Sequence, residues 1–238
     1  MNASTSTCTG FFRRLEHATA EARLALMDVP FVRHAQAGQL DSAEYRAFLE
    51  QAYHHVKHTV PLLMAAGARL HTSQRWALDA LTEYVAEEAG HDLWVLDDLA
   101  AAGGDARAAR EGSPAAACEL MVAYAYDCVE RVNPLALFGM VHVLEGTSVV
   151  AATRAADAIQ AHTGLPDSAF RYLRSHGALD VEHVGFFEEL MDRVAEPDDQ
   201  RAIVHAAQRF YALYADIFRA LPSRGPQCRS QEDLPHVA

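Results

Sequence analysis

The sequence predicts an all-α protein whose helices form a single bundle of about seven members. Apolar residues recur every three to four positions along nearly the whole chain, and no segment shows the sustained alternation of a strand. Short breaks with proline, glycine and polar residues separate the segments, as is typical of short loops between packed helices. Half of the 238 residues are apolar, so the chain can bury one substantial core.

The predicted helices have recognisable starts and ends. Asp41 is a preferred N-cap residue, and Asn133 followed by Pro134 places proline in the first turn of a helix. Gly164 is typical of a helix C-terminus, and Pro61 predicts a kink because proline lacks a backbone donor. In chain order, we expect helices over residues 11–27, 41–70, 72–102, 114–130, 134–163, 166–194 (with a break at Gly177) and 197–221.

Composition limits the function classes. We expect one helical domain over residues 11–221, a flexible start over 1–10 and a loose tail over 222–238. The formal net charge of −12 disfavours nucleic acid as a partner, because phosphate contacts need clustered lysine and arginine. The start lacks the apolar core of a secretory signal, and no apolar run reaches the ~20 residues of a membrane span. We therefore expect a cytoplasmic protein without a membrane partner; a homodimer is compatible with such a bundle.

The first chemically informative segment is Glu87-Glu88-Ala89-Gly90-His91. Residues three apart on one helix share a face, so Glu88 and His91 can address the same point in the core. Glu83 and Glu87 compete with Glu88 for this role. Taken alone, such a pair is more often a surface contact than a pair of metal ligands.

The second segment surrounds Glu145, whose neighbours from Phe138 to Leu144 are almost all apolar. A carboxylate in such surroundings is costly unless a cation, a metal or a hydrogen-bond donor compensates it. An arginine such as Arg154 could pair with Glu145 instead of a metal. His142 lies one turn before Glu145 and is a further candidate ligand.

The third segment is His176-Gly-Ala-Leu-Asp180-Val-Glu-His183. If it is one continuous helix, His176, Asp180 and His183 lie on one stripe. A separate cluster, His54, His55 and His58, could line a substrate pocket or supply a ligand, although packing within the helix is the more common role of such residues. Further pocket candidates, with core packing as the favoured alternative, are Tyr53, Phe138, Met140 and Phe187.

Together the three segments offer three histidines and three carboxylates. Helix bundles hold di-iron sites with inward-facing carboxylates and Glu-x-x-His pairs, and iron in redox enzymes accepts this mixture of oxygen and nitrogen ligands. Three negative charges facing two ferrous ions would also reduce the cost of burying the cluster. A structural zinc site is less natural, because the four cysteines are scattered and none is near these motifs.

The three blocks resemble the heme-oxygenase-like di-iron oxidases and oxygenases. The resemblance rests on Glu87–Leu99, on Leu144-Glu-Gly-Thr-Ser and on His176–Val184, which occur in the family's order, and it covers most of the chain. It implies a seven-helix heme-oxygenase-like bundle with two Fe(II) ions, or a manganese–iron pair, and dioxygen as co-substrate. The implied metal ligands are Glu88, His91, Glu145, His176, Asp180 and His183. Some relatives place the first glutamate seven residues before the histidine, where this chain has Tyr84.

The implied activity is O2-dependent oxidation of a small amino-acid- or fatty-acid-like molecule, by N-oxygenation, desaturation or C–C cleavage. One alternative is a metal-free relative, a thiaminase-like hydrolase or cofactor-free oxidase; the hydrolase would need Cys118 or Cys128 as nucleophile. A heme oxygenase would need a proximal histidine near the N-terminus, for which His17 is available. A ferritin-like iron-binding protein is the non-enzymatic alternative.

Overall fold

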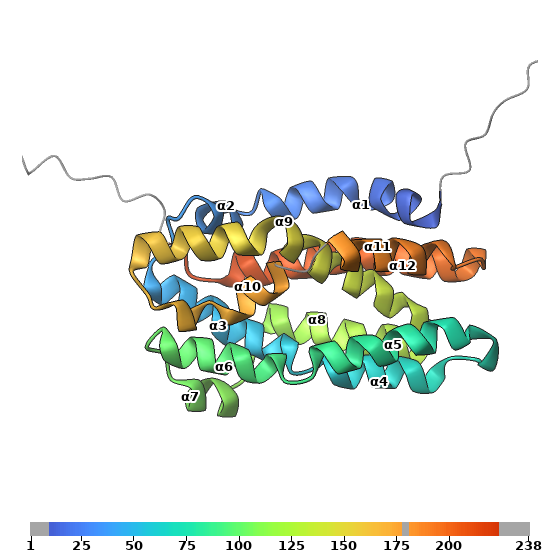
Figure 1. The fold of residues 1–238 in the computed structure, drawn as a ribbon, viewed down its shortest axis with the longest axis horizontal. Coiled ribbons are helices and arrows are strands. Elements are labelled where there is room, and N and C mark those ends of the chain that lie inside the picture. Colours follow the sequence, from blue (N-terminus) through green and yellow to red (C-terminus); the bar gives the residue numbers. More distant parts are fainter. Residues whose placement is uncertain (1–9, 178–180, 224–238) are drawn as a thin grey trace, which may run out of the picture.

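The computed structural model describes residues 10–177 and 181–223, apart from the side chains at positions 150, 176, 177 and 181–184. All regular elements in this part are helices, which confirms the predicted all-α class. Figure 1 shows them as an elongated bundle, with α1 and α2 along one edge and α4 to α7 along the other. Asp180 and most of the predicted loose ends lie outside the described residues.

The first half of the chain follows the predicted helices but divides them. Pro61 does not kink its helix locally; the break lies one turn earlier, at Lys57 and His58. The physical reason is that a proline ring clashes with the carbonyl four residues before it, which here belongs to Lys57. The helices of this half are α1 Phe11–Met27, α2 Pro30–Gln36, α3 Ser42–Val56, α4 Thr59–Arg69, the 3-10 turn Thr72–Gln74, α5 Arg75–Glu88 and α6 His91–Ala101.

The second half agrees more closely with prediction. Asn133 caps its helix by accepting from the backbone N–H of Leu135, and Gly164 ends α9 with a φ of 69°. The elements are α7 Ala106–Glu111, α8 Ala116–Asp127, the π-helical turn Cys128–Val132, the 3-10 turns Pro134–Ala136 and Asp167–Ala169, α9 Leu137–Thr163, α10 Arg171–Gly177, α11 Val181–Asp192 and α12 Pro197–Ala220. The predicted segment 166–194 corresponds to the turn Asp167–Ala169, α10 and α11, and residues 178–180 between the last two lie outside the described part.

The centre of the bundle is the pair α9 and α12. A Cβ atom at Gly139 of α9 would lie 2.7 Å from both the Ile203 carbonyl oxygen and the Ala207 nitrogen of α12. Glycine therefore allows these two helices to approach closely. Since α9 also packs on α2, α4 and α10, residues along it face several other helices at once.

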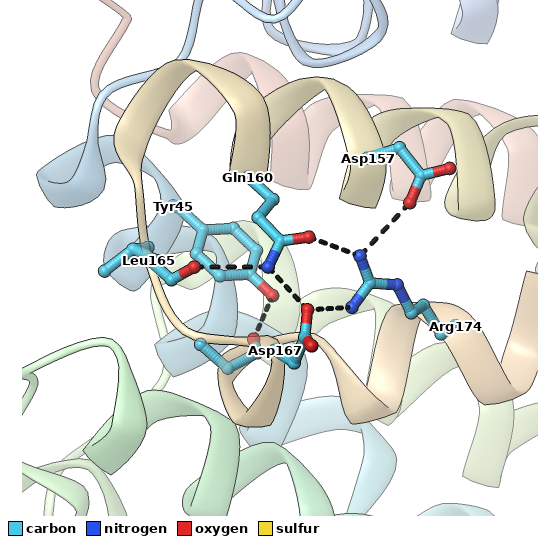
Figure 2. A network of polar contacts seen from close by, with 7 residues as sticks. Tyr45, Asp157, Gln160, Leu165, Asp167 and Arg174 are labelled. Carbon is cyan, nitrogen blue, oxygen red and sulfur yellow. Dashed lines mark hydrogen bonds and ion pairs between the residues drawn. The ribbon is translucent and has the colours of Figure 1, made fainter.

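A polar network fixes the turn between α9 and α10 (Figure 2). The Arg174 guanidinium donates to Gln160 at 2.6 Å and to Asp157 at 3.1 Å, both on α9. The Tyr45 hydroxyl of α3 donates to the carbonyl of Ala169, 2.7 Å away, in the same turn. These contacts hold α10 against α9 and α3.

No single helix among the described residues is long and apolar enough to cross a bilayer. The segments Pro134–Val149 and Ala151–Thr163, which meet at 44°, pass this test only when taken together. Much of their apolar surface, including Phe138, Val143 and Ile159, is buried in the core.

Candidate metal centre

The described part of the site begins at the junction of α5 and α6. The structure ends α5 at Glu88 and starts α6 at His91, so the pair does not lie on one continuous helix as predicted. Gly90 makes the break with a φ of 93°, a left-handed conformation that glycine adopts without a steric penalty. The two side chains still meet, with 3.0 Å between Glu88 Oε2 and His91 Nδ1.

The position of Glu88 is electrostatically unusual. It is the last residue of α5, where the negative end of the helix dipole disfavours a carboxylate. Its side chain is 14% exposed, whereas the rival residues Glu83 and Glu87 are exposed. Glu88 alone of these three lines the internal cavity described below. The structure therefore favours Glu88 as the cavity carboxylate.

Three contacts fix the helices that carry His91 and Tyr172. The Trp94 ring packs on the His91 ring with 4.2 Å between centroids, and the Arg171 guanidinium lies 3.9 Å from the Trp94 centroid. Asp98, fully buried on α6, accepts from the backbone N–H of Tyr172 at 2.8 Å. These contacts hold the start of α10, the helix that carries His176, against α6.

Glu145 faces Glu88 from α9. Both carboxylates line one cavity. The hydroxyl of Tyr84, from α5, donates a hydrogen bond to the Glu145 carboxyl. Burial, and then the negative charges of Glu88 and Glu87, raise the pKa of Glu145 to about 8, against the lowering effect of the Tyr84 hydrogen bond. Burial and the neighbouring negative charges thus disfavour the ionised form of Glu145 unless a cation is bound beside it.

The rest of the cavity wall is apolar and aromatic. Tyrosines Tyr172 and Tyr214 line it, and burial raises the pKa of both, so their hydroxyls stay protonated at neutral pH. His55 lies edge-on to Tyr214 with 5.9 Å between ring centroids. The remaining lining residues are Val56, Thr59, Leu63, Met140, Val141, Leu144 and Ser148.

Several sequence-based candidates lie elsewhere. Tyr53, Phe138 and Phe187 are core residues outside the cavity lining, and of the four pocket candidates Met140 alone lines this cavity. His54 contacts Lys57, and His58 contacts Tyr126, leaving His55 as the cavity residue of that cluster.

The other residues proposed as ligands or ion-pair partners also lie away from the two carboxylates. His142 Nε2 lies 3.1 Å from Thr19 Oγ1, and its ring packs on Phe187, so it joins α9 to α1 and α11 instead of facing the carboxylates. Arg154 is exposed, and the partner of Glu145 is Tyr84. His17 is exposed on α1.

The cysteines do not fit a nucleophile. Neither Cys118 nor Cys128 lines the carboxylate cavity. The Cys118 thiol is fully buried and donates to the Gln51 carbonyl at 3.6 Å. Burial raises the pKa of Cys118 to about 11, whereas a catalytic thiol needs a lowered value. The thiaminase-like hydrolase is therefore disfavoured.

Only three of the six predicted metal ligands have side chains that the structure describes. His176 belongs to α10, and His183 to α11, but their side chains, and all of Asp180, lie outside the described part. Among the side chains that are described, no three His, Cys, Asp or Glu residues gather closely enough to hold a metal ion. The donor types of Glu88, His91 and Glu145 nevertheless fit iron, and a cation would relieve the repulsion between the two cavity carboxylates.

Sequence reasoning missed Tyr172, Tyr214 and Asp98. Tyr172 had a detectable signal, because it lies one helical turn before His176. No sequence signal pointed to Tyr214, because it lies on α12, outside the segments that carry the predicted ligands. Asp98 lies in the block that carried the family resemblance, but only the fold brings it to the backbone of Tyr172.

Comparison with solved structures defines the class of this fold as heme-oxygenase-like. A domain of unknown function with this fold from Shewanella denitrificans is 22% identical with a TM-score of 0.77, covering 90% of this chain and 92% of that one. A TenA homologue from Pseudomonas syringae is 12% identical with a TM-score of 0.75, covering 88% and 91%. The heme oxygenase of Leptospira interrogans is 18% identical with a TM-score of 0.71, covering 90% and 100%.

The family follows from the sequence match. A family model described as "iron-containing redox enzyme" matches residues 46–215, well over half of the chain. The protein belongs to this family of iron-containing redox enzymes. No curated protein matches the sequence.

Proposed function

We propose that this protein is a non-heme di-iron oxidase or oxygenase that uses dioxygen to oxidise a small organic substrate. The observation that carries the proposal is that Glu88 of α5 and Glu145 of α9 line one cavity, with His91 in contact with Glu88. Two partly buried carboxylates in one cavity are costly to ionise together unless a cation binds between them. Family membership makes iron the natural cation.

The proposed ligand set is Glu88, His91 and Glu145 together with His176, Asp180 and His183. Bound iron, or a manganese–iron pair, would supply the activation of dioxygen. The chain's own contribution is orientation and exclusion of water. Tyr84 would hold the Glu145 carboxyl in one orientation, while Leu63, Met140 and Val141 keep the cavity wall apolar.

The test is metal content after anaerobic reconstitution with ferrous iron. Wild-type protein should retain about two irons per chain, as the donor count predicts. Glu88→Gln and Glu145→Gln should each lower this content. Glu83→Gln is the matched control, because Glu83 is exposed on the same helix as Glu88, one turn away.

A second measurement follows oxygen consumption by the reconstituted protein. His176→Ala and His183→Ala should abolish it while the helical circular dichroism persists, whereas His205→Ala, an exposed control on α12, should leave it unchanged. Wild-type protein that retains no iron, or full activity in both histidine variants, would overturn the proposal.

A further inference from the structure

The chain contains two tryptophans, Trp76 on α5 and Trp94 on α6, and both are half-buried. The Trp94 ring packs on the ring of His91, a predicted metal ligand, with 4.2 Å between the ring centroids. Trp76 packs on Phe138 instead, with 6.5 Å between centroids. It precedes Glu88 on α5 by about three turns, a rise of about 18 Å. The two indoles therefore stand in different relations to the candidate metal centre.

Trp94 also connects the candidate centre to the surface. The guanidinium of Arg171 lies 3.9 Å from the Trp94 ring centroid, and Arg171 is exposed. The His91 side chain, in contrast, is only 13% exposed. These contacts therefore lead from a largely buried imidazole, through a half-buried indole, to an exposed guanidinium.

An oxidase of the proposed kind needs electrons from outside the protein. Reduction of dioxygen to water takes up four electrons, and a two-electron oxidation of the substrate supplies two of them. A one-electron donor must supply the other two, one to each ferric ion, before the next round. Electron tunnelling slows steeply with distance, and it is faster through packed atoms than across a gap. A ring that reaches from the surface to a ligand imidazole therefore shortens the path.

The cavity tyrosines are less suited to this role. Tyr84, Tyr172 and Tyr214 are all buried, with 8% exposure or less, so a donor outside the protein cannot contact their rings as it can contact Trp94. The Tyr84 hydroxyl is also bonded to the carboxyl of Glu145. Among the aromatic residues described around the two carboxylates, Trp94 combines contact with a predicted ligand and access from outside.

We infer that electrons reach the iron through Trp94: a one-electron donor outside the protein binds beside Arg171, and its electron passes through the rings of Trp94 and His91. Each transfer oxidises the donor by one electron and reduces one ferric ion to ferrous, and no covalent bond forms or breaks. The inference rests on the proposed function, because iron is the acceptor. Neither Trp94 nor Arg171 is a predicted ligand, so their substitution leaves all six predicted ligands in place.

The first experiment tests the contact between Trp94 and the metal by fluorescence, without turnover. Each single-tryptophan variant is titrated anaerobically with ferrous iron. Trp76→Phe, which retains Trp94, should lose most of its emission as iron binds. Trp94→Phe, which retains Trp76, should lose much less. Zinc, which has no redox chemistry, is the control ion and should quench neither variant strongly. Equal quenching by iron in the two variants would overturn the inference.

The second experiment measures electron transfer itself. Iron-loaded protein is oxidised in air and mixed in a stopped-flow instrument with reduced ferredoxin, an acidic one-electron carrier too large to enter the cavity. The loss of ferric absorbance gives the rate. Trp94→Phe should be reduced severalfold more slowly than wild type at unchanged iron content, and Trp76→Phe, the matched control, at the wild-type rate.

The charge of Arg171 provides an independent variant that keeps the indole. Redox partners bind weakly through small interfaces, so one charge beside the contact point affects their encounter. Arg171→Glu should slow reduction by ferredoxin severalfold at low ionic strength, and salt should remove the difference. Arg193→Glu is the matched control, because Arg193 is exposed and lies 5.4 Å from the Trp76 ring centroid. Reduced methyl viologen, a cation, should not be slowed by Arg171→Glu, which separates lost attraction from damage to the fold.

The outcomes separate this inference from the proposed function. Wild-type protein that retains no iron would overturn both. Iron-loaded Trp94→Phe that ferredoxin reduces at the wild-type rate would overturn the inference alone. If Trp94→Phe does not fold or retain iron, Arg171→Glu decides: a rate with ferredoxin equal to that of Arg193→Glu would overturn the inference, and a selective loss would support it.

Discussion

The hydroxyl of Tyr84 on α5 donates a hydrogen bond to the carboxyl of Glu145 on α9. The two residues are 61 positions apart in the sequence, at positions 84 and 145. The family resemblance implies a glutamate ligand at this position in some relatives. In this chain the position carries a hydrogen-bond donor to a neighbouring carboxyl.

Replacement of Tyr84 by phenylalanine should weaken iron binding by about 10–100-fold, the usual effect of losing a hydrogen bond to a metal ligand. The physical reason is that Glu145 loses the donor that fixes its orientation. Iron affinity measured by competition with a chelator checks this. The control is Tyr53→Phe, in a tyrosine buried outside the cavity lining, and an equal loss of affinity there would contradict the assignment.

Asp98 makes the free energy of unfolding depend on pH, and one substitution can measure its contribution. Burial raises the pKa of Asp98 to about 6, against hydrogen bonds from the backbone of Tyr172 and Arg171 that lower it. The folded protein therefore holds a proton between about pH 4 and pH 6 that the unfolded chain releases, so this group's contribution to stability falls as pH rises through that window.

Asp98→Asn removes this dependence. Its free energy of unfolding relative to wild type should increase by up to about 3 kcal/mol between about pH 4 and pH 7, at 1.4 kcal/mol per pKa unit. Urea unfolding at both pH values provides the measurement. His142, whose pKa burial lowers to about 4, titrates in both proteins and cancels in the difference. A constant difference across the range would show that Asp98 does not titrate there.

Gly139→Ala should destabilise the bundle by about 1–3 kcal/mol or more, because the added Cβ meets the backbone of α12 and not a flexible side chain. Thermal and urea unfolding measure the effect. Gly185→Ala is the matched control: that glycine also lies within a helix, α11, but no atom of the described residues lies within 4 Å of an added Cβ. The control should be more stable by about 0.5–1 kcal/mol. Equal stability of the two variants would contradict the close approach of α9 and α12.

The start of α1 depends on a residue from the opposite end of the chain. Asp192, the last residue of α11, accepts from the backbone N–H of Phe12 at 2.8 Å, and Gly10 supplies no side-chain cap of its own. Asp192→Ala should therefore cost about 1 kcal/mol of stability and increase hydrogen exchange in the first turn of α1. Glu189→Ala, which changes an exposed residue of α11, serves as control. Unchanged exchange at Phe12 in Asp192→Ala would show that the cap contributes nothing.

Local sequence signals determined most of the helices. The helical period and the caps at Asp41, Asn133 and Gly164 predicted elements that the structure reproduces, because such signals act between residues a few positions apart. The predicted kink at Pro61 lies one turn after the observed break at Lys57, because the proline ring clashes with the carbonyl four residues before it. Gly90 was visible in the sequence, but its left-handed conformation was not, since glycine is also tolerated within helices.

The candidate site, too, was predictable from the sequence only in part. Glu145 was identifiable from the sequence because a carboxylate in an apolar segment is costly, and Glu88 because its spacing to His91 combines with the other histidines and carboxylates into one ligand pattern. That these two share one cavity, that Tyr84 holds Glu145, and that Tyr214 lines the same cavity were decided by the tertiary structure alone. Each of these relationships joins helices that are distant in the chain, and only the packing of α5, α9 and α12 determines which of their faces meet.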